Sequence, residues 1–192
     1  MPDVPTMDGV ALAAPILHRV LDSAVPVRLA ITPAPDLARL SLRGDAAALG
    51  TAFDIKLPGQ PGGTAVAGDR NALWLGPDEW LLLAQPGSLD PRTIVEAGAV
   101  VDISHRQVGL ILEGSDAADA LATGCPLDLH STVFAPGACT RTVFGKSEVV
   151  LWRTGAHCFH VEVARSYAAY VYTRLTGAAR ELEACRGLPP AR

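Results

Sequence analysis

The segment Asp102-Ile103-Ser104-His105-Arg106 is the most polar cluster of this chain inside an apolar context. An aspartate and a histidine three residues apart could relay a proton, because imidazole titrates near neutral pH and a carboxylate can orient it. The same residue types favour turns, in which Asp102 and Ser104 accept backbone hydrogen bonds while His105 and Arg106 point outwards. Because a predicted strand follows directly, we favour the turn.

Other reactive side chains lack the spacing that a site requires. His157 and His160 flank Cys158 on a predicted strand, where residues three apart face opposite sides. Glu79 and Glu162 could act as acids or bases, but neither has a sequence neighbour that would shift its pKa, so we expect solvated carboxylates. No nucleophile elbow or glycine-rich phosphate loop is present in the sequence. The sequence therefore predicts no catalytic, cofactor-binding or metal-binding residue.

Composition narrows the class of protein. The net charge is −4, and dispersed Arg and Lys residues give no footprint for nucleic acid. No apolar run reaches the roughly 18 residues of a membrane span, and the stretch 10–21 follows acidic rather than basic residues. Without close Cys pairs, buried free thiols are expected at Cys125, Cys139, Cys158 and Cys185. We expect a cytoplasmic protein that binds neither nucleic acid nor membrane.

The elements that must position these residues come from a sequence that repeats. Leu40-Ser41-Leu42-Arg43-Gly44-Asp45-Ala46-Ala47 recurs as Leu110-Ile111-Leu112-Glu113-Gly114-Ser115-Asp116-Ala117-Ala118, and Leu73-Trp74-Leu75 recurs as Leu151-Trp152-Arg153. The offsets are 70 (110 − 40) and 78 (151 − 73). Half of this chain has too little apolar material for its own core, so two similar halves should pack about a pseudo-twofold axis. The matching positions predict that Trp74 and Trp152 both pack at the shared interface.

The predicted organisation is one compact domain of two lobes. It consists of an N-terminal arm over residues 1–36, a first half over 37–98, a second half over 99–186 and a mobile tail over 187–192. Helices are expected near 13–21, at 46–53, 88–97 and 117–123, and at 166–184 after Ser166 as N-cap. Strands and helices alternate without long parallel crossovers, which predicts an α+β fold of antiparallel sheets with packed helices.

Several segments together resemble the gamma subunit of heterotetrameric sarcosine oxidase. They are Asp102-Ile103-Ser104-His105-Arg106-Gln107-Val108-Gly109-Leu110, Glu113-Gly114-Ser115-Asp116-Ala117-Ala118, Ala122-Thr123-Gly124-Cys125-Pro126-Leu127-Asp128-Leu129, Arg141-Thr142-Val143-Phe144-Gly145-Lys146 and Gly76-Pro77-Asp78-Glu79-Trp80-Leu81. The resemblance covers roughly residues 36–172 and implies two ferredoxin-like halves, related to the folate-binding aminomethyltransferase fold. In those transferases the folate-contacting acid lies in an Asp-Asp pair, where this chain has Ser147 and Glu148.

The resemblance also implies a role in a complex. Enzymes of this family demethylate sarcosine oxidatively to glycine, with formaldehyde or methylene-tetrahydrofolate and hydrogen peroxide as further products. FAD, FMN, NAD and tetrahydrofolate are associated with the partner subunits. The gamma chain is therefore expected to be a non-catalytic assembly subunit that binds the alpha, beta and delta subunits, although activity of the isolated chain is left open.

Permanent interfaces use aromatic and arginine anchors. The candidate anchors are Trp80, His105, Arg106, Arg141, Phe144 and Arg153. The alternative function is a stand-alone folate-binding one-carbon transfer protein of the aminomethyltransferase type, which the shared Asp-x-Ser-His segment motivates.

Overall fold

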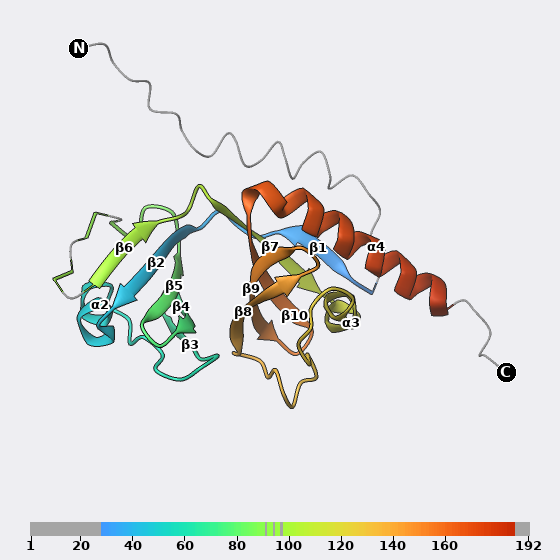
Figure 1. The fold of residues 1–192 in the computed structure, drawn as a ribbon, viewed down its shortest axis with the longest axis horizontal. Coiled ribbons are helices and arrows are strands. Elements are labelled where there is room, and N and C mark those ends of the chain that lie inside the picture. The colour runs from blue at the N-terminus through green and yellow to red at the C-terminus, as the bar shows by residue number, and fades with distance from the viewer. Residues whose placement is uncertain (1–27, 91, 94, 97, 187–192) are drawn as a thin grey trace, which may run out of the picture.

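Two five-stranded antiparallel sheets form the framework of the molecule (Figure 1). The computed structural model describes residues 28–90, 92–93, 95–96 and 98–186. In spatial order, the first sheet contains β3 (Thr64–Ala67), β4 (Arg70–Gly76), β5 (Glu79–Ala84), β2 (Ala38–Gly44) and β6 (Gly98–Asp102). The second contains β1 (Ala30–Pro33), β7 (Gln107–Glu113), β10 (Cys158–Ala164), β9 (Ser147–Gly155) and β8 (Cys139–Phe144). The predicted α+β fold with antiparallel sheets is confirmed.

Each half contains a unit of strand, glycine turn and helix. Gly44 adopts a φ of 123°, and the side chain of Asp45 then accepts a hydrogen bond of 2.7 Å from Ala48 N–H at the start of α2 (Ala46–Ala52). Gly114 adopts a φ of 138° before α3 (Ala117–Ala122). The glycine turn thus repeats, whereas the side-chain cap does not, because Asp116 makes no capping bond and instead accepts from Arg186.

The helix predictions are only partly right. The last helix is α4 (Ala168–Arg186), and Ser166 lies before it in the short 3₁₀ helix η1 (Arg165–Tyr167) instead of capping it. The helix expected at 88–97 is wrong, because the described residues there form turns. The helix expected at 13–21 lies outside the described residues.

The two repeats exchange their first strands. The first repeat runs from β1 to β5 and the second from β6 to β10, in the same order of strands and helix. β1, however, pairs with β7 of the second repeat, and β6 pairs with β2 of the first. Residues 30–33, which the sequence assigned to an arm, therefore complete the second sheet, and residues 98–102 complete the first.

Two equivalent connections carry out this exchange. We call residues 34–37 the first crossover and residues 103–106 the second crossover. Ala34 N–H donates to Gly109 O, and Ile103 N–H donates to Arg39 O, each over 2.9 Å. The same bond at both places shows that the pseudo-twofold symmetry extends to the crossovers.

Strand register corrects the predicted equivalence of the tryptophans. Trp74 stands opposite Trp80, and Arg153 stands opposite Phe159. Trp80 and Phe159 are the equivalent residues, because each also stands opposite the matching leucine of β2 or β7. Trp74 therefore corresponds to Arg153, one position after Trp152, and a one-residue shift reverses the face of a strand. Trp74 packs under α2, and only Trp152 packs between the sheets, so the prediction was wrong for Trp74.

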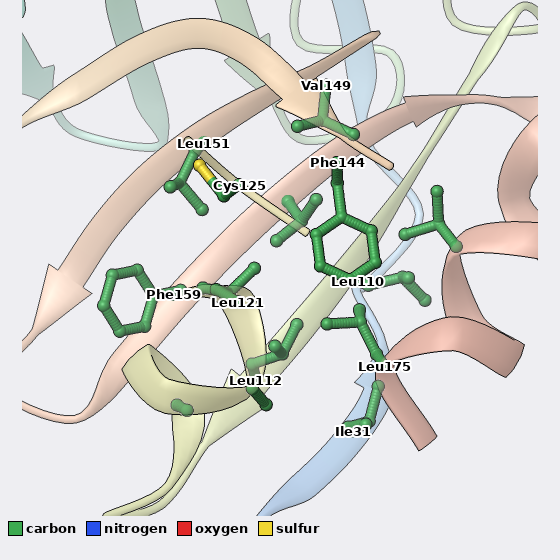
Figure 2. Packing of buried hydrophobic residues seen from close by; sticks show 14 of the residues in the cluster. Ile31, Leu110, Leu112, Leu121, Cys125, Phe144, Val149, Leu151, Phe159 and Leu175 are labelled. Carbon is green, nitrogen blue, oxygen red and sulfur yellow. The ribbon is translucent and has the colours of Figure 1, made fainter. Parts of the chain in front are cut away.

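Three apolar clusters hold the fold together. The largest lies between the second sheet and helices α3 and α4, where Leu110, Phe144 and Phe159 meet Leu121 and Leu175 (Figure 2). A smaller cluster lies between the first sheet and α2. The third joins the two sheets and contains Leu73, Leu81, Leu83, Cys139 and Val150. This third cluster is the shared interface between the two halves.

Candidate functional site

A buried charged cluster fastens the two halves together. Arg39 on β2 donates from Nε to Glu162 Oε2 over 2.6 Å and from Nη2 to Oε1 over 3.0 Å. His160 Nε2 lies 2.7 Å from the same Oε1 atom, and Arg39 Nη1 donates to Leu37 O in the first crossover. Burial would raise the pKa of Glu162, but the His160 hydrogen bond and the Arg39 charge hold this pKa below its ordinary value.

The cluster fills its space. A Cβ atom on Gly109 would lie 2.7 Å from Ala34 Cβ, 2.8 Å from His160 Nε2 and 2.9 Å from Glu162 Oε1. The bare backbone of a glycine is therefore required for β7 to pass the buried side chains. Both carboxylate oxygens are bonded and the neighbouring space is occupied. This cluster therefore holds β2 and β10 together.

A second charged cluster crosses between the halves nearer the surface. Arg141 on β8 donates from Nη2 to Glu79 Oε1 over 2.5 Å, and Arg43 donates from Nη2 to Oε2 over 2.7 Å. The Arg141 hydrogen bond, aided by the charges of both arginines, lowers the pKa of Glu79 against the opposing effect of burial. The expectation that Glu79 and Glu162 are solvated is wrong, because both are buried and bonded to arginines. Arg141 lies 62 residues from Glu79 in sequence, and Arg39 lies 123 residues from Glu162.

The lowered pKa of Glu79 predicts a loss of stability in acid. A carboxyl whose pKa is lower in the folded state stabilises the fold above its ordinary pKa, and this contribution disappears as the pH falls through the folded pKa. We expect Glu79→Gln to lower the free energy of unfolding at pH 7 and to flatten its decline below pH 4.5, the ordinary pKa of Glu. Urea unfolding at a series of pH values measures this. Glu113→Gln, at an exposed carboxylate, should keep the wild-type slope; an unchanged slope in Glu79→Gln would contradict the assignment.

Three of the predicted interface anchors are buried inside this chain. Trp80 is 2% exposed and its indole N–H donates to Pro58 O over 2.8 Å, while Phe144 is fully buried in the large cluster. Arg153 is 4% exposed and its guanidinium stands over the ring of Phe159. These side chains support the fold and present no surface to a partner.

Arg153 organises a long surface segment. Its guanidinium nitrogens donate to the carbonyls of Leu129, Phe134, Gly155 and Ala156. These bonds fix the connection between α3 and β8 and the turn between β9 and β10. A buried arginine can thus serve entirely as a clamp on backbone carbonyls.

The second crossover forms the predicted turn. Asp102 accepts a hydrogen bond of 2.9 Å from Ser104 N–H, and Ser104 Oγ accepts one of 2.9 Å from Arg39 N–H. His105 and Arg106 are exposed, as expected. Within the described part of the chain, no hydrogen bond joins Asp102 to His105, so the polar cluster is used to build the turn. His105, Arg106 and the partly exposed Arg141 stay as predicted interface residues.

The four cysteines lie in different environments. Cys125 and Cys139 are buried and free, and burial raises the pKa of Cys139 to about 12. Cys158 is half-buried and Cys185 is exposed, so the expectation of burial is wrong for Cys185. Among residues 28–90, 92–93, 95–96 and 98–186, no group of three or more His, Cys, Asp or Glu side chains could hold a metal. Helices long and apolar enough to cross a bilayer are likewise absent from these residues.

Comparison with known proteins identifies relatives by sequence. Residues 41–181 match the model of the sarcosine oxidase gamma subunit family. The chain is 37% identical over 146 residues to sarcosine oxidase subunit gamma of Corynebacterium sp. strain U-96, covering 72% of this chain and 70% of the relative. It is 40% identical over 121 residues to the subunit from Arthrobacter sp., and spans 60% of that relative's length.

Solved structures agree with the sequence relatives. The heterotetrameric sarcosine oxidase from Corynebacterium sp. U-96, in complex with pyrrole 2-carboxylate, contains a similar chain with a TM-score of 0.79 and 30% identity, covering 93% of this chain and 97% of that one. The glycine cleavage system aminomethyltransferase T from Bartonella henselae shares the fold, with a TM-score of 0.61 at 15% identity over 86% of this chain and 49% of the transferase. By sequence and by fold, the chain belongs to the sarcosine oxidase gamma subunit family.

Proposed function

We propose that this chain is a non-catalytic assembly subunit of a heterotetrameric sarcosine oxidase, in which it binds the alpha, beta and delta subunits. The observation that carries the proposal is the match of nearly the whole chain, 93% of it, to one chain of a solved heterotetrameric sarcosine oxidase. The charged side chains between the halves support a structural role, because Glu79 and Glu162 are both bonded to arginines of the opposite half.

In this proposal the chemistry takes place on other chains. FAD, FMN, NAD and tetrahydrofolate would be held by the partner subunits, which would demethylate sarcosine to glycine. The free thiols support a reducing compartment such as the cytoplasm, since disulfides form and persist in oxidising compartments.

Co-expression with the three other subunits tests this assignment. We expect purification through a tag on this chain to recover a complex of four kinds of chain, as judged by size-exclusion chromatography. After the subunits are separated, the flavin should be found on the other subunits. A chain that stays monomeric in the presence of the alpha, beta and delta subunits would refute the proposal.

Calorimetry on the isolated chain tests the alternative function. A stand-alone one-carbon transfer protein predicts saturable binding of tetrahydrofolate, whereas an assembly subunit predicts no binding heat up to millimolar ligand. Saturable heat from the isolated chain would favour the folate-binding function over the one proposed.

A further inference from the structure

The outer edge of β6 is open. β6 pairs with β2 on one side, and no strand pairs with its other side among the described residues (Figure 1). The strand reads Gly-Ala-Val-Val-Asp, and Val101 is 53% exposed. Such an edge offers unpaired backbone groups to another chain.

The direction of these backbone groups follows from the register. In an antiparallel pair, alternate residues direct their N–H and C=O groups toward the partner strand. Because Ile103 N–H donates to Arg39 O, the groups of Ala99 and Val101 point toward β2. The N–H and C=O groups of Val100 and Asp102 therefore point outwards from the sheet.

The other three sheet edges are short or more polar. β1 has four residues and ends at Pro33, which has no N–H. β3 also has four residues, and Thr64 at its start donates to Gly137 O in the segment before β8. β8 has six residues, but its sequence Cys-Thr-Arg-Thr-Val-Phe is more polar, and Arg141 on it pairs with Glu79. The first N–H of each strand is bonded to a loop, from Cys139 to Gly62 O in β8 and from Gly98 to Val95 O in β6. β6 is thus the edge that combines five residues, apolar composition and free backbone groups.

We propose that an extended segment of a partner subunit of the sarcosine oxidase pairs with the outer edge of β6 and adds a sixth strand to the first sheet. This inference rests on the proposed function. Main-chain bonds to Val100 and Asp102 would hold the segment, which is the mode of recognition called β-augmentation.

The surface continues beyond the strand. His105 and Arg106 lie in the second crossover after β6, are exposed, and make no ion pair within the described residues. The backbone N–H of Arg165 donates to Arg106 O over 2.8 Å, so the exposed Tyr167 in η1 belongs to a neighbouring segment. A stable interface needs roughly 800 Å² on each partner, more than a five-residue edge supplies. The interface should therefore extend onto the surface around His105 and Arg106. Because Arg106 is positively charged, we expect the added segment to carry an acidic residue there.

A charge on the edge tests this pairing. Lysine on an edge strand blocks the approach of another strand. We expect Val101→Lys to weaken binding to the preassembled alpha, beta and delta subunits by at least about tenfold. Val66→Lys is the matched control, since Val66 is 66% exposed on the opposite edge of the same sheet, and its binding should stay within about twofold of wild type. Circular dichroism of both isolated variants checks the fold.

Hydrogen exchange gives a readout that needs no substitution. The amides of Val100 and Asp102 should exchange at least about tenfold more slowly in the complex than in the free chain, if a strand covers them. If the wild-type chain does not assemble, the proposed function fails. If it assembles while Val101→Lys binds normally, or while both amides exchange as fast as before, only the β6 pairing is overturned. A dimer of the free chain that Val101→Lys dissociates, with complex assembly intact, would assign the edge to a second copy and also overturn it.

Discussion

Replacing Glu162 with alanine is expected to destabilise the protein by about 3–5 kcal/mol, because the Arg39 charge stays buried without its carboxylate. Both side chains are almost fully enclosed, and the pair joins β2 of one half to β10 of the other. For a chain of this size, such a loss lowers the melting temperature by roughly 6–20 °C. Urea unfolding and thermal melts at pH 7 measure the effect.

A double variant separates the buried charge from the lost packing. Arg39→Met combined with Glu162→Leu removes both charges and keeps most of the apolar volume, so we expect it to recover much of the stability that Glu162→Ala loses. A double variant as unstable as Glu162→Ala would show that the ion pair itself, with its His160 bond, is required. A loss below about 1 kcal/mol in the single variant would contradict the assigned burial.

Replacing Gly114 with alanine is expected to cost about 3 kcal/mol or more, because two independent constraints fall on this residue. Its φ of 138° lies where side chains are rarely tolerated, and an added Cβ would lie 2.1 Å from Arg28 O. Relieving that overlap requires movement of the backbone just before β1. We expect a lower melting temperature together with faster amide exchange in β1.

Gly177→Ala is the matched control for this substitution. Gly177 lies within α4, and an added Cβ there meets nothing within 4 Å. Alanine should stabilise the helix by roughly 0.5–1 kcal/mol. Equal stability of Gly114→Ala and wild type would contradict the close approach of β1 to the turn before α3.

Local chemistry was predictable from the sequence, and long-range partners were not. Gly44 and Asp45 predict a turn and a cap through their own dihedral and hydrogen-bonding properties, and the structure has both. The predicted helix at 88–97 failed because the side chains of Ser88 and Thr93 bond to carbonyls three residues earlier and favour turns. The ion pairs of Glu79 and Glu162 with arginines left no local pattern, whereas His160, two residues before Glu162 on the same face of the strand, was a signal for a bonded partner.

The predicted interface residues divide in the same way. Trp80 begins the run Trp80-Leu81-Leu82-Leu83-Ala84, which is buried on both faces. A continuous apolar run is typical of a strand covered on both sides, so this signal could have excluded Trp80 as a surface anchor. Arg153 had no comparable signal, because its acceptors are backbone carbonyls, which leave no side-chain pattern, and those of Leu129 and Phe134 come from a distant segment. His105 and Arg106 lie on the surface because their turn does.

The exchanged first strands affect how the chain can be made. Ala30 pairs with Glu113, so a ribosome must add 83 further residues (113 − 30) before β1 has a partner. During that time the strand is exposed to chaperones or to wrong pairing. Neither repeat is self-sufficient after a cut between β5 and β6, because each fragment then carries an edge strand of the other's sheet. Each fragment should therefore fold only when the other fragment is present.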